Sequence, residues 1–193
     1  GETGFGTGLN FLVTWQAWRE SPEPRPDLHY LSIEKHPLTK QDLARVLNSW
    51  PALATLAQPL LAAYPALLAG QHRVLLDDGR VRLDLWWEDA ATALPDLASR
   101  AQPLFDAWYL DGFSPSCNPS MWTTQLFQAA ATLCQPGASF GTFTAAGDVR
   151  RKLTDAGFTV DKVAGYGRKR DCLRGVIDVK AALPSDTKRS PWD

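Results

Sequence analysis

The sequence is poor in sulfur-containing residues and histidine: its 193 residues include three cysteines, one methionine and three histidines. The cysteines stand at positions 117, 134 and 172, with no CxxC pair and no histidine at a metal-ligand interval. This spacing excludes a disulfide framework and a zinc motif, so we expect no metal. Long hydrophobic runs are lacking too, because the apolar stretches fall well short of the roughly 20 residues of a membrane helix. With no signal peptide predicted either, we expect a cytoplasmic protein without membrane contact.

An excess of charge of one sign is also absent. The chain has 20 basic and 21 acidic residues, a net charge of -1, and 45% hydrophobic residues. At this length a compact fold buries roughly 70% of the surface of its unfolded chain, which excludes disorder and predicts one ordinary folded domain. Any surface that faces nucleic acid must therefore be a local basic patch.

Hydrophobic periodicity predicts alternating helices and strands. A helix is expected from Gly8 to about Glu20, followed by a strand at Leu28–Ile33. An Asp-Gly pair between two alternating segments predicts a hairpin over residues 72–87. Further helices are predicted at residues 39–50, 52–68, 119–134 and 147–156, and further strands at residues 105–110, 139–144, 158–163 and 172–179. This order predicts an α/β fold with a mostly parallel sheet.

A glycine-rich turn opens the chain, with Gly4, Gly6 and Gly8 at every second position. Such a turn brings the backbone close to a ligand, and the following helix presents unpaired N–H groups, which favours a nucleotide-like cofactor. The third glycine of the dinucleotide motif GxGxxG would be residue 9, which is leucine, and this weakens an NAD or FAD hypothesis. No Gly-Lys-Ser/Thr follows, which excludes a P-loop. A connection without any ligand is the alternative.

Carboxylates follow three of the expected strands. Glu34 stands where it can accept both ribose hydroxyls of an adenosine cofactor, or where it can pair in solvent with Lys35. Asp89 can accept the adenine amino group, or cap a helix that begins at Ala90. Asp111 ends the strand before Gly112, so an open α/β sheet would place it beside the cofactor.

An aromatic and proline-containing loop follows that third carboxylate. Phe113, Ser114 and Pro115 are expected to form a rim suited to a flat substrate such as a stacked base. The alternative is a loop packed by its own aromatic side chains. Two basic clusters, residues 150–152 and 168–170, are candidates for phosphate contacts, although a solvated helix face or a turn would also explain them.

Several strings in order along residues 1–179 resemble one family. They are GETGFGTGLNFL, SIEK, YLDGFSP, TFTAAG, VRR and GYGRKR. The sequence is similar to the methyltransferase half of the bacterial bifunctional tRNA 5-methylaminomethyl-2-thiouridine biosynthesis proteins, the MnmC family. It departs from the family's usual pattern at Cys117, where a lysine is more common, and at Asp148, where a bulky apolar residue is usual.

The resemblance implies a Rossmann-like, S-adenosylmethionine-dependent methyltransferase fold at residues 1–180, with the first strand largely missing. It implies that residues 181–193 are a linker or tail leading to an absent FAD-dependent oxidase half. The implied reaction methylates the aminomethyl group of 5-aminomethyl-2-thiouridine at the tRNA wobble position, and the implied partner besides tRNA is that oxidase, with the chain itself a monomer. A methyltransferase of small-molecule amines, a nicotinamide or flavin oxidoreductase and a non-catalytic RNA-binding module are the alternatives.

The resemblance also assigns residues to the site. Asp111 is the expected catalytic residue, beside the transferred methyl group. The residues expected at the cofactor are Glu2, Gly4, Phe5, Gly6, Gly8, Asn10, Glu34, Lys35, Asp89 and Asp111. The residues expected at the RNA substrate are Phe113, Ser114, Pro115, Asn118, Arg150, Arg151, Arg168, Lys169 and Arg170.

Overall fold

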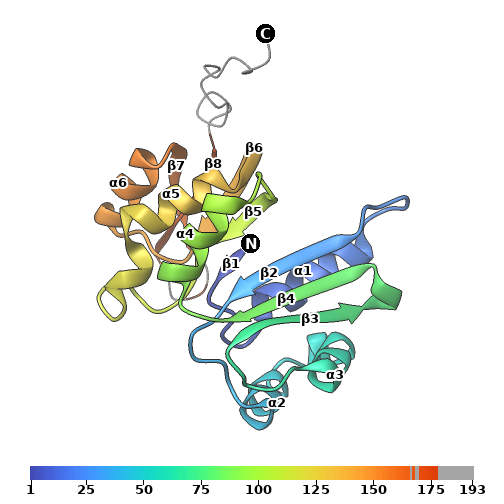
Figure 1. Cartoon of the computed structure of the whole chain (residues 1–193). Helices are drawn as coiled ribbons and strands as arrows, with labels where there is room; N and C mark the ends of the chain where they lie inside the picture. Colours follow the sequence, from blue (N-terminus) through green and yellow to red (C-terminus); the bar gives the residue numbers. More distant parts are fainter. Residues whose placement is uncertain (166, 168–169, 178–193) are drawn as a thin grey trace, which may run out of the picture. The chain divides into compact units, whose positions relative to one another are not determined.

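The structure of the chain is a computed structural model that describes residues 1–165, 167 and 170–177. The chain divides into two compact units (Figure 1). The first unit comprises residues 1–93 and 109–121, and the second comprises residues 94–108 and the described residues from 122 onward. The linker predicted at residues 181–193 lies outside the described residues, as do Arg168 and Lys169.

The first unit consists of a sheet and three helices. Its strands are β1 (Glu2–Thr3), β2 (Leu28–Ile33), β3 (Gly70–Leu76) and β4 (Val81–Trp87), in the spatial order β3-β4-β2-β1. Its helices are α1 (Leu9–Glu20), α2 (Lys40–Leu47) and α3 (Ala54–Ala63), with 3₁₀ turns at Pro51–Leu53 and Asp77–Gly79. Strands β1, β2 and β4 are parallel to one another, whereas β3 is antiparallel to β4.

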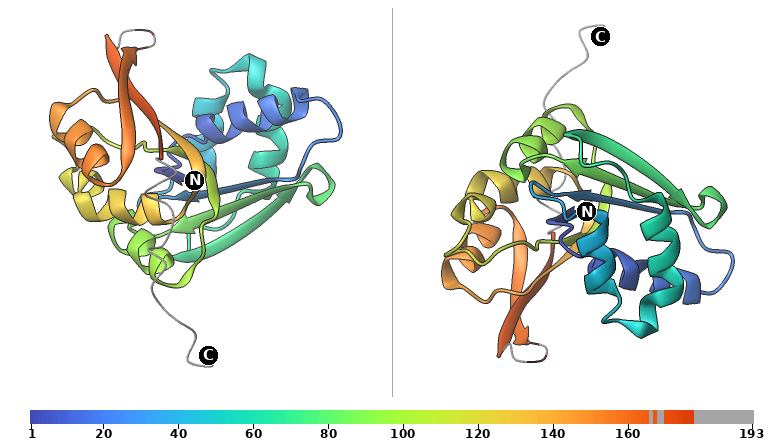
Figure 2. Two further views of the ribbon diagram at one scale, coloured as in Figure 1. Left: turned by 90° about the horizontal axis from the view of Figure 1, so that it is seen from above. Right: turned by 90° about the horizontal axis from the view of Figure 1, so that it is seen from below.

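The three helices lie on one face of strands β2, β3 and β4 (Figure 2). Alternate residues of the strands point to this face, as the two-residue period of a strand requires. Tyr30 and Leu83, paired in register, are buried there together with Phe11 and Trp15 of α1 and Leu60 of α3. This packing anchors α1, and with it the glycine turn that precedes the helix.

The second unit follows the same alternation of helix and strand. Helix α4 (Ala90–Arg100) begins in the first unit and continues here, followed by β5 (Phe105–Tyr109), the 3₁₀ turn Pro119–Trp122 and α5 (Thr124–Thr132). The remaining elements are β6 (Cys134–Thr142), α6 (Gly147–Asp155), β7 (Phe158–Ala164) and β8 (Asp171–Ile177). The strand order is β5-β6-β8-β7, and β8 is antiparallel to both β6 and β7.

Most sequence-based element predictions are confirmed, and three differ clearly from the structure in their bounds. The helix predicted at 52–68 ends at Ala63, because Tyr64 precedes Pro65 and adopts an extended conformation with ψ 124°. The helix predicted at 119–134 is a 3₁₀ turn and a separate α5, whose N-cap Thr123 accepts a hydrogen bond from the Leu126 N–H. Strand β6 then begins at Cys134, earlier than predicted.

Candidate active site

The first unit contains a cavity of about 510 Å³. This volume lies within the range of roughly 300–1,000 Å³ that is typical of small-molecule sites. Four segments of the unit line it: the glycine turn, the end of β2, the start of α4 and the loop after β5. The lining residues are Gly4, Phe5, Gly6, Thr7, Leu9, Asn10, Ile33, Glu34, Lys35, His36, Leu38, Asp89, Ala90, Asp111, Gly112, Phe113, Asn118, Ser120 and Met121.

The glycine turn needs its glycines for conformation and for space. Gly4, Gly6 and Gly8 have φ angles of 111°, 51° and 68°, in the region that side chains disfavour. A Cβ atom on Gly8 would also lie 2.8 Å from Cζ of Phe5, whose ring is buried beneath the turn. The turn therefore keeps its backbone at the cavity wall, where a ligand can approach closely.

Glu34 ties the glycine turn to the end of β2. Its Oε2 accepts a hydrogen bond from the Gly6 N–H at 3.0 Å, and its Oε1 accepts one from the His36 N–H at 2.8 Å. An ionised carboxylate has about four acceptor positions, so two remain for a ligand. The carboxylate thus has the capacity for ribose hydroxyls that the sequence predicts, while it also shapes the turn.

Lys35 and Asp89 form an ion pair on the cavity wall, with Nζ and Oδ2 2.7 Å apart. Asp89 Oδ1 also accepts a hydrogen bond from the Ala91 N–H at 2.9 Å, in the first turn of α4. The hydrogen bond from Lys35, together with this backbone bond, lowers the pKa of the Asp89 carboxyl. The predicted capping role is confirmed, and the solvent pair predicted between Lys35 and Glu34 is replaced by this pair with Asp89.

Asp111 is held from three sides where the loop after β5 meets the glycine turn. Its Oδ2 accepts a hydrogen bond from Asn10 Nδ2 at 3.0 Å, and its Oδ1 accepts one from the Gly112 N–H at 2.7 Å. Its backbone carbonyl accepts a hydrogen bond from Thr3 Oγ1 at 3.0 Å. The side chain is therefore fixed in one orientation at the cavity.

Glu2 lies behind this group. It is 0% exposed and is not among the residues that line the cavity. Its carboxylate accepts hydrogen bonds from Asn10 Nδ2 at 2.8 Å and Ser32 Oγ at 2.7 Å. Burial raises the pKa of the Glu2 carboxyl to about 7, even though these two hydrogen bonds lower it. Its predicted direct contact with the cofactor is thus not supported by its position.

The loop after β5 forms the open rim. Phe113 is 68% exposed and lines the cavity, as does Asn118, whose Oδ1 accepts a hydrogen bond from Ser120 Oγ at 2.7 Å. Ser114 and Pro115 do not line the cavity, because the loop turns there and the Ser114 hydroxyl meets Ser116 Oγ at 3.0 Å. Of the predicted rim, the structure brings Phe113 to the cavity, together with Asn118, which was predicted at the substrate.

The basic residues predicted to contact RNA belong to the second unit. Arg150 and Arg151 lie on α6, where Arg151 pairs with Asp148 at 3.2 Å, and Arg170 precedes β8. Nine residues that line the cavity were not predicted from the sequence: Thr7, Leu9, Ile33, His36, Leu38, Ala90, Gly112, Ser120 and Met121. Each lies close in the sequence to a predicted site residue, and this proximity was the available signal.

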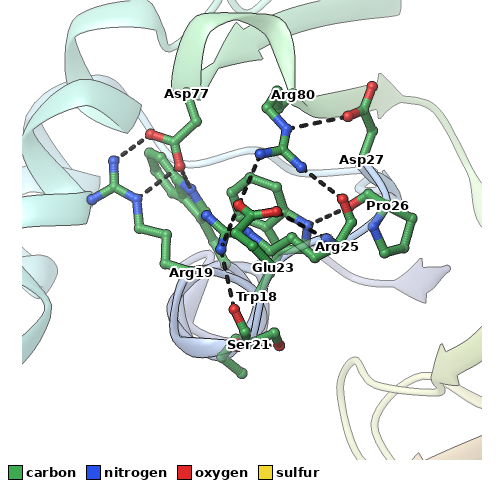
Figure 3. Close-up of polar contacts among 11 residues, drawn as sticks. Trp18, Arg19, Ser21, Glu23, Arg25, Pro26, Asp27, Asp77 and Arg80 are labelled. Carbon is green, nitrogen blue, oxygen red and sulfur yellow. Dashed lines mark hydrogen bonds and ion pairs between the residues drawn. The ribbon is translucent and has the colours of Figure 1, made fainter.

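A second cavity, of about 430 Å³, lies between α1 and the β3–β4 turn. Three arginines line it, and each pairs with a carboxylate: Arg19 with Asp77, and Arg25 and Arg80 with Glu23 (Figure 3). The Arg25 and Arg80 guanidinium groups also lie over the Trp18 ring, 4.4 Å and 5.2 Å from its centre. These ion pairs and ring contacts hold the segment between α1 and β2 in place, and we assign the cluster a structural role.

Two further features are absent from the described residues. No helix in that part of the chain has the length and apolar character needed to cross a membrane. No group of three or more potential metal-ligating side chains was found there either.

The cavity, the glycine turn and the carboxylates agree with the result of comparison with known proteins. The chain belongs to the S-adenosyl-L-methionine-dependent methyltransferases, whose family model matches residues 51–178. The Rossmann-like α/β fold and the S-adenosylmethionine cofactor expected from the sequence are thereby confirmed, and the nicotinamide or flavin alternative is disfavoured.

More specific relatives share the sequence or the fold. The whole chain is 52% identical to part of the tRNA 5-methylaminomethyl-2-thiouridine biosynthesis bifunctional protein MnmC of Aeromonas hydrophila, and it spans 29% of that protein's length. The crystal structure of MNMC2 from Aquifex aeolicus superposes with a TM-score of 0.67 at 22% identity, covering 95% of this chain and 53% of that one. The antibiotic-resistance methyltransferase Kmr superposes with a TM-score of 0.50 at 10% identity, covering 92% and 84%. The resemblance to the MnmC methyltransferase half is thus confirmed.

Proposed function

We propose that the chain transfers the methyl group of S-adenosylmethionine to the primary amine of 5-aminomethyl-2-thiouridine at the tRNA wobble position, giving 5-methylaminomethyl-2-thiouridine. The observation that carries this proposal is the cavity, in which a fixed carboxylate, Asp111, lies close to an exposed aromatic ring, Phe113. The 52% identity to a protein named for the biosynthesis of this nucleoside supports the choice of substrate.

The cavity fits the cofactor in size and chemistry. Gly4 and Gly6 leave room for a close approach, and Glu34 keeps acceptor capacity for ribose hydroxyls. Asp89 and Lys35 lie on the same wall, where Asp89 can accept a hydrogen bond from the adenine amino group. The bound cofactor supplies an electrophilic methyl group on a sulfonium.

Asp111 serves to align the acceptor amine. Methyl transfer forms an N–C bond as the C–S bond breaks, and it requires an unprotonated nitrogen lone pair. An aliphatic amine with a pKa of about 10.4 is neutral in only roughly one molecule in 2,500 at pH 7. Because a bare carboxylate favours the protonated amine, Asp111 acts chiefly by orienting the N–H groups, and it can accept the proton that the methylated amine releases.

The rim receives the base. The exposed ring of Phe113 offers a flat face for stacking, and Asn118 offers an amide for the base edge. Arg150, Arg151 and Arg170, with Arg168 and Lys169 outside the described residues, supply phosphate contacts in this proposal. Such contacts make tRNA binding fall steeply with salt concentration.

We infer further that the chain works as part of a bifunctional enzyme in the cytoplasm. Residues 1–180 form the methyltransferase domain as a monomer, and residues 181–193 lead to an FAD-dependent oxidase. The name of the Aeromonas relative, a bifunctional protein, supports this arrangement. In this proposal FAD belongs to that oxidase.

Calorimetric titration with S-adenosylmethionine, followed by a methyl-transfer assay, tests the proposal. We expect binding of S-adenosylmethionine but not of NADH, and transfer to tRNA that carries 5-aminomethyl-2-thiouridine. Unmodified tRNA and free 5-aminomethyl-2-thiouridine are the control acceptors. Transfer to the free nucleoside alone would indicate a small-molecule methyltransferase, and cofactor binding without transfer to either would refute the proposed substrate.

A further inference from the structure

A buried carboxylate stands behind the proposed catalytic residue. Glu2 on β1 has no exposed surface, and both of its oxygens are engaged by neutral donors, Asn10 Nδ2 at 2.8 Å and Ser32 Oγ at 2.7 Å. A buried charge held only by neutral donors is costly for a fold. Such a group is expected to have a role that a hydrophobic side chain could not fill.

The Asn10 side chain connects this carboxylate to the cavity. An amide nitrogen carries two hydrogens. One of those on Asn10 Nδ2 is donated to Glu2 Oε1 at 2.8 Å and the other to Asp111 Oδ2 at 3.0 Å. With both hydrogens used, the position of the amide is fixed by Glu2, and the amide in turn fixes one oxygen of Asp111.

We propose that Glu2 is a positioning residue for methyl transfer, which acts through the Asn10 amide to hold the Asp111 carboxylate and touches neither cofactor nor substrate. This inference rests on the proposed function, since it requires Asp111 to orient the acceptor amine. It separates Glu2 from Gly4, Phe5, Gly6 and Thr7 of the glycine turn, which line the cavity, whereas Gly8, predicted at the cofactor, does not.

The connection persists in both protonation states of Glu2. Burial raises the pKa of Glu2 to about 7, and the nearby charge of Asp111 adds to this effect. The ionised carboxylate accepts both hydrogen bonds, whereas the protonated acid still accepts from Asn10 with one oxygen while its hydroxyl donates to the Ser32 oxygen. The hydrogen bonds of Glu2, rather than its charge, therefore hold the Asn10 amide.

Three titratable groups surround Glu2. Asp111 comes from the loop after β5, and Tyr30 comes from β2 with a buried hydroxyl that lacks a partner of good hydrogen-bonding geometry among the described residues. Tyr109, the residue paired with Glu2 in the sheet, stacks on Tyr30, and its hydroxyl meets Thr14 Oγ1 at 3.0 Å. Burial keeps the pKa of Tyr30 well above its usual range, so this phenol stays uncharged between pH 5 and 8. The pKa of Glu2, raised by burial to about 7, lies within that interval.

Two substitutions in the full chain separate positioning from binding. Asn10→Ala removes the connecting amide, so we expect kcat to fall ~10-fold or more, as misplacement of a catalytic group does, while the Kd for S-adenosylmethionine changes less than ~3-fold. Glu2→Gln keeps both hydrogen bonds, because its Oε1 accepts from Asn10 and its Nε2 donates to Ser32. We expect this variant to retain kcat within ~3-fold of wild type at both pH 8 and pH 6.

Matched controls and the double variant complete the test. Asn48→Ala makes the same chemical change at an exposed position and should leave kcat unchanged. Glu2→Ala with Asn10→Ala should lower kcat no further than Asn10→Ala alone, because both act through one connection. Thermal unfolding of each variant excludes loss of the fold as the cause.

The outcomes distinguish the two proposals. Wild-type turnover by Asn10→Ala, a kcat of Glu2→Gln as low as that of Asn10→Ala, or equal losses in Kd and kcat would each overturn the positioning role and leave the proposed function intact. A wild-type chain that binds cofactor but transfers no methyl group to the modified tRNA would overturn the proposed function, and this inference with it.

Discussion

Gly4 and Gly112 approach each other so closely that a Cβ atom on Gly4 would lie 3.2 Å from the Gly112 Cα. The contact joins the glycine turn to the loop that carries Asp111, and both residues line the cavity. Gly4→Ala should therefore lower the free energy of unfolding by about 1–3 kcal/mol through its positive φ, and should also weaken cofactor binding. Chemical denaturation and calorimetric titration measure the two effects.

Gly70→Ala is the matched control for that substitution. Gly70 has a φ of 123°, close to the 111° of Gly4, but a Cβ atom there would meet nothing within 4 Å. Gly70→Ala should lower the free energy of unfolding through its positive φ, as Gly4→Ala does, and should leave the affinity for the cofactor unchanged. Equal cofactor affinities of Gly4→Ala and wild type would show that the close approach has no part in binding.

The charge of Asp111 can be removed with little change of shape. Asp111→Asn keeps an oxygen for the Asn10 hydrogen bond but loses the carboxylate. We expect kcat for methyl transfer to fall about 100-fold, in the range found for groups that position or accept protons, with cofactor and tRNA affinities within about 3-fold of wild type. Asp106→Asn, an exposed change on the preceding strand β5, should have wild-type kinetics. A fully active Asp111→Asn enzyme would remove Asp111 from the mechanism.

Glu34 uses both carboxylate oxygens to hold backbone N–H groups, of Gly6 and of His36. Glu34→Gln replaces one carboxylate oxygen with an NH₂ group, so the backbone N–H of Gly6 or of His36 loses its acceptor. An unsatisfied donor costs about 1–3 kcal/mol. Affinity for S-adenosylmethionine should fall about 10-fold, which calorimetry can measure. Glu20→Gln at the exposed end of α1 serves as the control. Unchanged affinity would mean that the turn does not depend on Glu34.

The fold was predictable where local signals agree with tertiary packing. Helix α1 begins directly after Gly8, and β2 has the predicted bounds Leu28–Ile33, because each is bounded by glycine or proline and has a clear period. Periodicity could not show that residues 119–134 hold two helical segments and the start of a strand. That division depends on Thr123, whose side chain caps α5 by accepting a hydrogen bond from the Leu126 N–H, a contact that periodicity does not reveal.

For the candidate site, the sequence predicted the residues that follow the strand ends. Glu34, Asp89 and Asp111 lie on the cavity because strand ends in an α/β sheet gather near a ligand. Their hydrogen-bond partners could not be read from the sequence, because Asn10 and Asp111 are 101 residues apart and meet only through the sheet. The burial of Glu2 likewise follows from its neighbours on three elements.

Asp84 on β4 forms the centre of an ion-paired group that does not line the cavity. Asp84 is 8% exposed. Its carboxylate accepts two hydrogen bonds of 2.7 Å from Arg73 on β3, and its Oδ2 lies 2.7 Å from Nε2 of His29 on β2. Burial raises the pKa of the Asp84 carboxyl, but the hydrogen bonds from Arg73 and His29 outweigh it and lower the pKa from 3.8 to about 2. The ionised form is therefore favoured by folding.

Because folding lowers the pKa of Asp84, the ionised carboxylate stabilises the fold in full at pH values above the pKa of the unfolded chain. This stabilisation is lost as the pH falls through about 2. A shift of nearly two pKa units corresponds to about 2 kcal/mol, so Asp84→Asn should lower the free energy of unfolding by about that amount at pH 7. The difference between variant and wild type should shrink to roughly half by pH 3. Asp96→Asn, which removes an exposed pair with Arg100, should cost at most about 0.5 kcal/mol at any pH. Urea denaturation at pH 7, 5 and 3 makes the comparison, and a difference that does not change with pH would contradict the assignment.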